Sequence, residues 1–170
     1  MNTASKYVAR RVLPGLLCGV GLVTSGAVNA DDVNNAVNAN PLVFADGISH
    51  ELIRVVASTP AGVTTELVIT HSFECAVEGN DTVTFFNLDI LVDGVLVPPT
   101  ASDNASCTST PPDNDLMGLD DWVTTSITVV RSVPGGNHVV VVRGRLVGFD
   151  AGERVRVDDQ SLVVEEEDAT

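Results

Sequence analysis

Polar and apolar side chains alternate most regularly along residues 66–78. One set of alternating positions is apolar apart from a single histidine: Leu67, Ile69, His71, Phe73, Cys75 and Val77. The intervening positions are mostly polar, with glutamates and hydroxyl residues in most places. Successive side chains of a strand point to opposite faces of a sheet, so this two-residue period predicts a strand with one buried and one solvated face.

The same period continues through the last third of the chain. Residues 122–129 alternate and are rich in β-branched side chains, the sequence Pro-Gly-Gly-Asn interrupts the pattern at 134–137, and residues 138–149 alternate again. Proline fixes φ and glycine accepts positive φ, so a chain reversal is predicted at 134–137. Two short strands over 154–158 and 161–164 complete a predicted antiparallel meander with one wet face.

Further strands are predicted earlier in the chain, over residues 42–44, 50–57, 82–92 and 95–97. Asp93-Gly94 lies between the last two, and a two-residue Asp-Gly loop favours a type I′ hairpin because both of its residues take positive φ. No helical periodicity follows residue 30. The pattern predicts one all-β domain over residues 42–167, an antiparallel β-sandwich of jelly-roll or immunoglobulin-like type with seven to nine strands.

Residues 1–30 have the layout of a secretory signal peptide. Three basic residues precede an apolar run over residues 12–23, and small residues precede Asp31. The apolar run is 12 residues long, whereas roughly 20 are needed to cross a bilayer, so export is expected rather than a transmembrane segment. Residues 31–41 are rich in asparagine and aspartate and are expected to form a flexible lead-in. The protein is therefore expected in the periplasm or outside the cell.

Charge narrows the range of partners. The chain has nine Lys and Arg residues and 23 Asp and Glu residues. Three basic and no acidic residues lie in residues 1–30, which leaves six arginines and a net charge of about −17. Such a surface repels nucleic acid and anionic membranes, so neither is an expected partner. Two explanations stay open for the acidity: solubility in a salty habitat, or divalent-cation binding.

Two cysteines, Cys75 and Cys107, follow the signal segment. An even number of cysteines in an exported protein indicates a disulfide. Closing a loop of about 30 residues stabilises a fold by about 3–4 kcal/mol in the chain-entropy description. Metal ligation and a catalytic thiol are the alternatives, but neither has supporting neighbours. We therefore expect a Cys75–Cys107 disulfide.

Residues 100–121 form the main candidate loop, with many aspartates and little strand character. Residues 113–118 begin like a calcium loop, but Met117 stands where such a loop needs an oxygen donor and Thr124 where it needs a bidentate glutamate, which excludes an EF-hand. An irregular Ca²⁺ site stays open, with these ligands: Asp113, Asp115, Asp120 and Asp121. The alternative is an ordinary acidic turn and no cofactor.

Other candidate chemistry is sparse. His50, His71 and His138 lack metal-ligand spacing, and no serine-hydrolase, zinc-protease or phosphate-loop motif is present. No pattern marks a pair of carboxylates for glycoside hydrolysis. Trp122 is the candidate platform for stacking on a ligand, and its alternative role is packing.

One resemblance to known families concerns the C-terminal segments. Residues 134–142, Pro-Gly-Gly-Asn-His followed by four valines, and residues 161–165, Ser-Leu-Val-Val-Glu, resemble the last hairpin of secreted bacterial jelly-roll domains. Those domains are similar to the tumour-necrosis-factor and complement-head sandwiches. The resemblance implies a trimer or a ligand-binding head, which leaves a homo-oligomer open, but no functional residue carries over. Those trimer cores are aromatic-rich, whereas this chain has five Phe, one Trp and one Tyr.

Two functions follow as hypotheses. The first is an exported non-enzymatic binding or structural module of the periplasm or cell exterior, whose partner is an unknown protein or surface ligand. The alternative is a secreted hydrolase-like enzyme whose site is built from the acidic 100–121 loop. Abundant strands without a reactive constellation of side chains favour the first.

Overall fold

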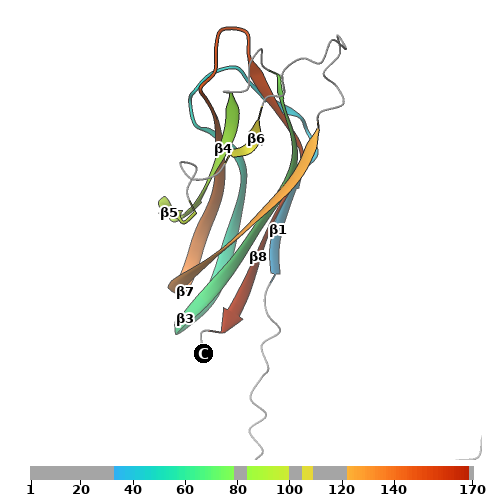
Figure 1. Ribbon diagram of the computed structural model, residues 1–170. Coiled ribbons are helices and arrows are strands. Elements are labelled where there is room, and N and C mark those ends of the chain that lie inside the picture. The colour runs from blue at the N-terminus through green and yellow to red at the C-terminus, as the bar shows by residue number, and fades with distance from the viewer. Residues whose placement is uncertain (1–32, 79–83, 100–104, 109–121, 169–170) are drawn as a thin grey trace, which may run out of the picture.

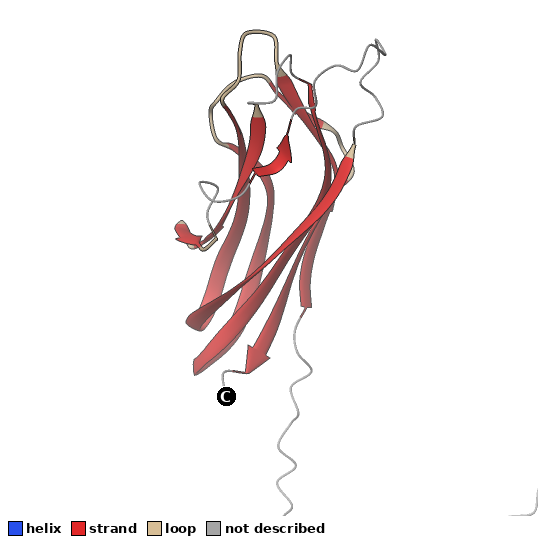
Figure 2. Cartoon of the chain, viewed as in Figure 1, coloured by secondary structure: helices blue, strands red, loops and turns tan. Residues whose placement is uncertain are grey.

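The computed structural model describes residues 33–78, 84–99, 105–108 and 122–168. All regular secondary structure in these ranges is β-strand, and every strand pair is antiparallel (Figure 2). The strands are β1 (Val33–Asn38), β2 (Leu42–Phe44), β3 (His50–Glu78), β4 (Phe85–Val92), β5 (Val95–Val97), β6 (Ala105–Thr108), β7 (Val123–Val147) and β8 (Arg154–Asp168). The predicted all-β antiparallel class is confirmed.

The strands form one continuous sheet that folds over into the two layers of a sandwich (Figure 1). One layer runs β1–β8–β3–β7 and contains the C-terminal half of β3 and the N-terminal half of β7. The other runs β3–β7–β4–β5 and contains the opposite halves of both long strands. We call them the β8 layer and the β4 layer. β2 lies beside β1 on β8, and β6 lies beside β5 on β4.

β3 and β7 pass between the layers together, as a paired ribbon. Thr59 pairs with Gly136 on one side of the fold-over, and Thr64 pairs with Pro134 on the other. β3 therefore uses four residues, 60–63, where β7 uses one. The fold-over lies at the lower end of the view in Figure 1, where the labels of both strands stand. β3 follows the longer, outer path around this bend, and β7 follows the inner path.

Glycine is required on the inner path because the two backbones touch there. A Cβ added to Gly135 would collide with the carbonyl oxygen of Pro60, the Cα of Ala61 and the amide nitrogen of Gly62. Gly62 and Gly136 have φ angles of 83° and 147°, which residues with a side chain rarely adopt. The glycines and prolines of both strands thus bend the ribbon at one place.

The predicted meander in the last third of the chain is wrong. Residues 123–134 and 138–147 belong to one strand, and each half pairs with β3 rather than with the other half. Residues 134–137 bend β7 but do not form a hairpin. β3 bends at the same point, so β7 stays paired with β3 on both sides of the bend. In the same way, 154–158 and 161–164 are parts of the single strand β8.

The hydrophobic core lies between the layers. Phe73 of the β8 layer meets Phe86 of the β4 layer edge to face, with 6.3 Å between ring centroids. Alternate residues of the central strands supply most of the other large core side chains: Leu67, Ile69, Leu88, Ile90, Val140, Val142, Val155, Val157, Leu162 and Val164. Burying one such aliphatic side chain contributes about 1.5–3 kcal/mol, so the facing layers hold each other in place.

The predicted disulfide between Cys75 and Cys107 is present, with both residues buried. Cys75 belongs to the part of β3 in the β8 layer, whereas Cys107 lies opposite Phe86 on β6 in the β4 layer. The bond therefore joins the two layers, through residues 32 apart in sequence.

Two segments predicted to be irregular contain strands. β1 lies in the expected flexible lead-in, 31–41, and pairs with β8 from Val33 to Asn38. Three of its six residues are asparagines and both of its valines are exposed, so its backbone hydrogen bonds rather than a buried face hold it in place. β6 lies in the 100–121 loop and pairs with residues 85–87 of β4. The sandwich thus begins at least nine residues before the predicted position 42.

The type I′ prediction for the β4–β5 hairpin is confirmed. Asp93 and Gly94 have φ angles of 52° and 79°, and Val92 pairs with Val95 across the turn. The signal segment predicted for residues 1–30 lies outside the described residues. In the described ranges, no helix is long and apolar enough to cross a membrane.

Replacing Cys107 with serine should destabilise the fold by about 3–4 kcal/mol, because the unfolded chain would lose its cross-link. Thermal unfolding of the oxidised wild type, the reduced wild type and the variant measures this. The reduced wild type and the variant should melt at nearly the same temperature, well below the oxidised protein. Equal melting of all three forms would contradict the role assigned to the disulfide.

Candidate functional site

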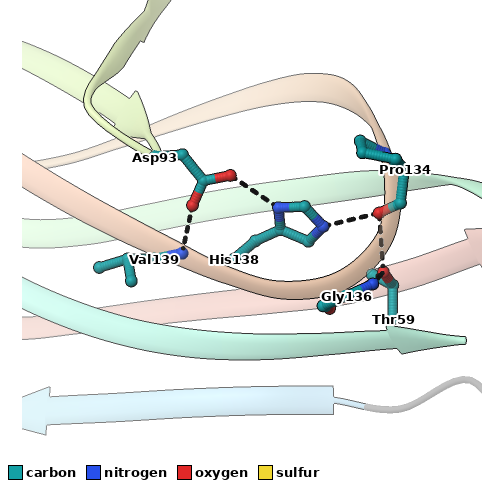
Figure 3. A network of polar contacts seen from close by, with 6 residues as sticks. All are labelled: Thr59, Asp93, Pro134, Gly136, His138 and Val139. Carbon is teal, nitrogen blue, oxygen red and sulfur yellow. Dashed lines mark hydrogen bonds and ion pairs between the residues drawn. The ribbon is translucent and has the colours of Figure 1, made fainter. Parts of the chain in front are cut away.

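A buried histidine ties the fold-over to the β4–β5 turn (Figure 3). Nδ1 of His138 lies 2.7 Å from Oδ2 of Asp93, and its Nε2 lies 2.7 Å from the carbonyl oxygen of Pro134. The other carboxylate oxygen of Asp93 accepts the N–H of Val139 at 2.8 Å. The Asp93 amide donates to the Val139 carbonyl at 2.9 Å. The turn, the bend and β7 are therefore held as one unit.

Thr59 extends this network into β3. Its buried hydroxyl accepts the N–H of Gly136 at 3.0 Å and lies within 3.1–3.2 Å of the carbonyl oxygens of Pro134 and Gly136. The Thr59 side chain thus contacts backbone groups at the bend, where the regular ladder is interrupted.

The surroundings of His138 favour its charged form. Burial lowers the pKa of His138, but the Asp93 carboxylate, the Pro134 carbonyl and the charge of Glu166 outweigh burial and raise it above 6.5. The hydrogen bond from His138 also lowers the pKa of Asp93 below 3.8. Both ring nitrogens face acceptors, and only the imidazolium can donate to both. A charged His138–Asp93 pair is therefore favoured at mildly acidic pH.

This pair is arranged as a clamp and not as a catalytic dyad. A general base needs a ring nitrogen that can reach a substrate proton. Both nitrogens of His138 are instead taken by protein acceptors, and the residue is only 5% exposed. The geometry supports a structural role for this histidine at the fold-over.

His71 is fully buried on the inner face of β3. Its ring stacks on Phe73, with 4.8 Å between centroids and 14° between planes. Burial lowers the pKa of His71 from 6.5 to about 4, and the neighbouring side chain of Gln160 offsets this only in part. His71 is therefore a neutral core residue at pH 7, closed to solvent.

Glu153 is a buried acid that the sequence analysis did not find. It ends the turn before β8 but is only 1% exposed. Its carboxylate accepts hydrogen bonds from the hydroxyl of Thr84 and from the N–H of Asp150, the latter at 2.7 Å. A glutamate after a glycine turn ordinarily lies in solvent, so no sequence signal marks this residue. Its contacts fix the loop between β7 and β8.

The structure places only some of the predicted site residues. Trp122 is half-buried directly before β7, and its role as a ligand platform stays a prediction. The aspartates of the predicted Ca²⁺ site lie outside the described residues: Asp113, Asp115, Asp120 and Asp121. Within the described part of the chain, no group of three or more His, Cys, Asp or Glu side chains is placed to hold a metal ion.

The outer face of the β4 layer combines arginines with apolar side chains. Pairing across the strands gives rows of residues on the side away from the core: Arg54–Val141–Leu91–Leu96, Val56–Val139, Glu51–Arg143–Asp89 and Arg145–Asn87. Asn87, Leu91 and Val141 are nevertheless buried, so the exposed part of these rows is formed by their other members. Arg54 donates to both carboxylate oxygens of Glu51, at 3.0 and 2.7 Å. Val56 and Leu96 are about half exposed, at 54% and 45%. We call these rows the arginine face.

The outer face of the β8 layer is mainly acidic and hydroxylated. Its outward acids are Glu66, Glu74, Glu78, Asp158, Glu165 and Glu167. Thr70 pairs with Thr128 and Ser72 with Ser126 through hydroxyl contacts of 3.0 and 2.9 Å. Two arginines, 154 and 156, lie at one end, where both contact Glu78. The two broad faces of the sandwich are therefore chemically different.

Comparison with known proteins gives distant structural likenesses. No protein-family model and no curated protein matches the sequence. The structure is similar to a family 35 carbohydrate-binding module from Clostridium thermocellum, with 13% identity, a TM-score of 0.33, and coverage of 79% of this chain and 97% of that one. It is also similar to latent PorU from Porphyromonas gingivalis, with 11% identity, a TM-score of 0.32, and coverage of 81% of this chain and 13% of that one. Both likenesses are too distant to carry an argument about function.

The two segments that resemble a jelly-roll hairpin do not form one. Residues 136–142 pair within the β4 layer, whereas residues 161–165 belong to β8 in the other layer. Both segments of this chain are valine-rich and contribute buried residues to the core, which is the feature they share with a jelly-roll hairpin.

Replacing His138 with glutamine should make stability less dependent on pH. The folded pKa of His138 lies above its unfolded value of about 6.5, so its contribution is complete below about pH 6.5 and is lost as pH rises through the folded pKa. The variant should be less stable by about 1.5–3 kcal/mol near pH 6, the usual value of a hydrogen bond to a charged group, and this deficit should shrink toward pH 9.

Urea unfolding from pH 5.5 to 9 measures this difference. His50→Gln is the matched control, because His50 makes a similar 2.6 Å contact with Asp46 on the surface, away from the fold-over. A deficit for His138→Gln that is constant across this pH range would show that the charge of the clamp contributes nothing.

Proposed function

We propose that the protein is an exported, non-enzymatic binding or structural module that works through the broad outer faces of its sandwich. The observation that carries this proposal is the arginine face. Only six arginines follow residue 30, and three of them, at 54, 143 and 145, lie on this one face. The buried histidines are occupied inside the fold, which leaves the surfaces as the places where a partner can be recognised.

The chemistry of the arginine face suits a partner surface with carboxylates beside apolar groups. A guanidinium offers a planar fork that matches a carboxylate, and arginine with apolar side chains is a composition enriched in protein interfaces. Val56 and Leu96 flank the arginines and expose apolar surface. Glu51 and Asp89 lie in the same rows and partly balance the charge, which favours short-range recognition over attraction of a polyanion.

Export is supported by chemistry as well as by the layout of residues 1–30. The Cys75–Cys107 disulfide closes the two layers, and such bonds persist in oxidising compartments. We therefore place the module in the periplasm or at the cell exterior.

A titration with hexanoate, a carboxylate with an apolar tail, tests the face. The titration is followed by amide chemical shifts in NMR spectra at 0.15 M NaCl. The residues whose shifts change should cluster around 54, 141, 143 and 145. Arg143→Ser combined with Arg145→Ser should remove the response. The control Arg154→Ser with Arg156→Ser changes the net charge equally on the opposite face and should keep it.

Hexanol added in place of hexanoate separates apolar contact from carboxylate recognition and should bind less. Equal loss of the hexanoate response in both arginine variants would show that only net charge matters and would refute the face as a site.

The alternative function, a hydrolase-like enzyme with a site in the 100–121 loop, is tested separately by the effect of Ca²⁺ on stability. Ca²⁺ held by the aspartates of that loop would raise the melting temperature beyond the effect of NaCl at matched ionic strength. We expect instead that NaCl reproduces the effect, because screening alone relieves the repulsion between surface carboxylates. A Ca²⁺-specific rise that Asp115→Asn abolishes would favour the alternative.

A further inference from the structure

The β8 layer ends in two edges that no strand of the described residues covers. Among the described strands β1 pairs only with β8, so no described strand lies along its other side over Val33–Asn38. β7 pairs only with β3 over residues 123–134, and meets β4 only from residue 140 onward. An uncovered edge offers a row of backbone donors and acceptors to any strand that can approach it.

The edges of the β4 layer have features that discourage pairing with a strand of another chain. Its β3 edge carries the charged Glu51 and Arg54 and a register shift between residues 51 and 53. Its β5 edge is only three residues long and is followed by Pro98-Pro99. Charges, irregular register, short length and proline all discourage pairing with another chain.

The two edges of the β8 layer have few of these devices. Residues 33–38 and 123–130 contain no charged residue and no proline, and Arg131 and Pro134 lie only at the end of the β7 edge next to the fold-over. Both edges instead expose valines: Val33 is 56% exposed, Val37 74%, Val123 48% and Val130 53%. β-branched residues on an open edge favour strand pairing.

The strand directions make these edges complementary to each other. β1, β8, β3 and β7 are each antiparallel to the next, and the layer has four strands. A second copy shifted sideways by the width of the layer would therefore place its β1 antiparallel to β7 of the first. The alternation of directions would continue across the contact.

The register of the layer specifies which residues would meet. Val33, Glu165, Val68 and Val130 form one row across its four strands. Continuing that row sets Val33 of the second copy beside Val130 of the first, so two half-exposed valines would cover each other.

We propose that copies of this protein join edge to edge, with β1 of one copy adding to β7 of the next. A second copy has an edge with the matching strand direction and a valine at the matching register position. Because the contact is head-to-tail, it does not close on itself and extends into a filament, which the twist of the sheet makes helical. This goes beyond the arginine face, which stays exposed on the other layer.

The net negative charge sets the conditions for assembly. Equivalent residues of neighbouring copies would be four strand spacings apart, roughly 19 Å, which is about twice the screening length in 0.15 M salt. Repulsion between acidic faces is thus strong at low salt and weak at physiological salt. Assembly should increase with NaCl.

A cysteine pair in the mature chain tests both the contact and its register. Within one copy two strands separate Val33 from Val130, a gap of roughly 14 Å that no disulfide can span. Val33→Cys with Val130→Cys should therefore give a ladder of multimers on a non-reducing gel after mild oxidation in 0.15 M NaCl. The offset pair Val37→Cys with Val130→Cys is misplaced by four residues and should give no ladder.

Single-cysteine variants complete the experiment. Val130→Cys alone should stay monomeric on the gel, and a dimer of it would indicate pairing of β7 with β7 and overturn the proposal. Absence of a ladder from the Val33/Val130 pair, or equal ladders from both pairs, would also overturn it. Melting curves and light scattering of each reduced variant show that it is folded and how far it associates.

Discussion

The architecture depends on one constraint: two paired strands must fold over together without losing their ladder. Around such a bend the outer strand needs a longer path than the inner one, and β3 meets this with residues 60–63 against the single Gly135. The inner path leaves no room for a side chain at Gly135. Backbone groups freed by the bend find partners in Thr59 and in the charged His138–Asp93 clamp. The disulfide then closes the far side of the fold by joining the same two layers.

The fold-over also exchanges the positions of the two long strands. β3 is an edge strand in the β4 layer and a central strand in the β8 layer, whereas β7 is central in the β4 layer and an edge in the β8 layer. Each half has a sequence suited to its position. The β3 edge carries charge and an irregular register, and the β7 edge carries valine, threonine and serine. One bend thereby produces a protected layer with the arginine face and a second layer with two edges that no described strand covers.

Sequence patterns predicted the local features and missed those set by distant pairing. Alternation along 66–78, the Asp93-Gly94 turn and the Cys75–Cys107 bond depend on neighbouring residues or on few possible partners, and each is present. The Pro-Gly-Gly sequence at 134–136 has the same signature whether the chain reverses or bends, and only the matching bend in β3 distinguishes the two.

The sequence did not indicate β1 or the buried polar residues, for a similar reason. β1 has no hydrophobic period, because pairing with β8 rather than a buried face holds it in place. His138 and Glu153 become buried through contacts with Asp93 and Thr84, which are more than 40 residues away in sequence. No local pattern carries that information.

Amide hydrogen exchange of the protein, in dilute low-salt solution, tests the exchange of strand positions most directly. In an antiparallel sheet the N–H groups of a strand point alternately to its two sides. Consecutive amides should be protected over residues 140–144 of β7, which pair with β3 on one side and β4 on the other, and alternate amides over residues 123–133, which pair with β3 alone among the described strands. Unbroken protection over 123–133, or alternation over 140–144, would contradict the fold-over of β7 from the centre of one layer to the edge of the other.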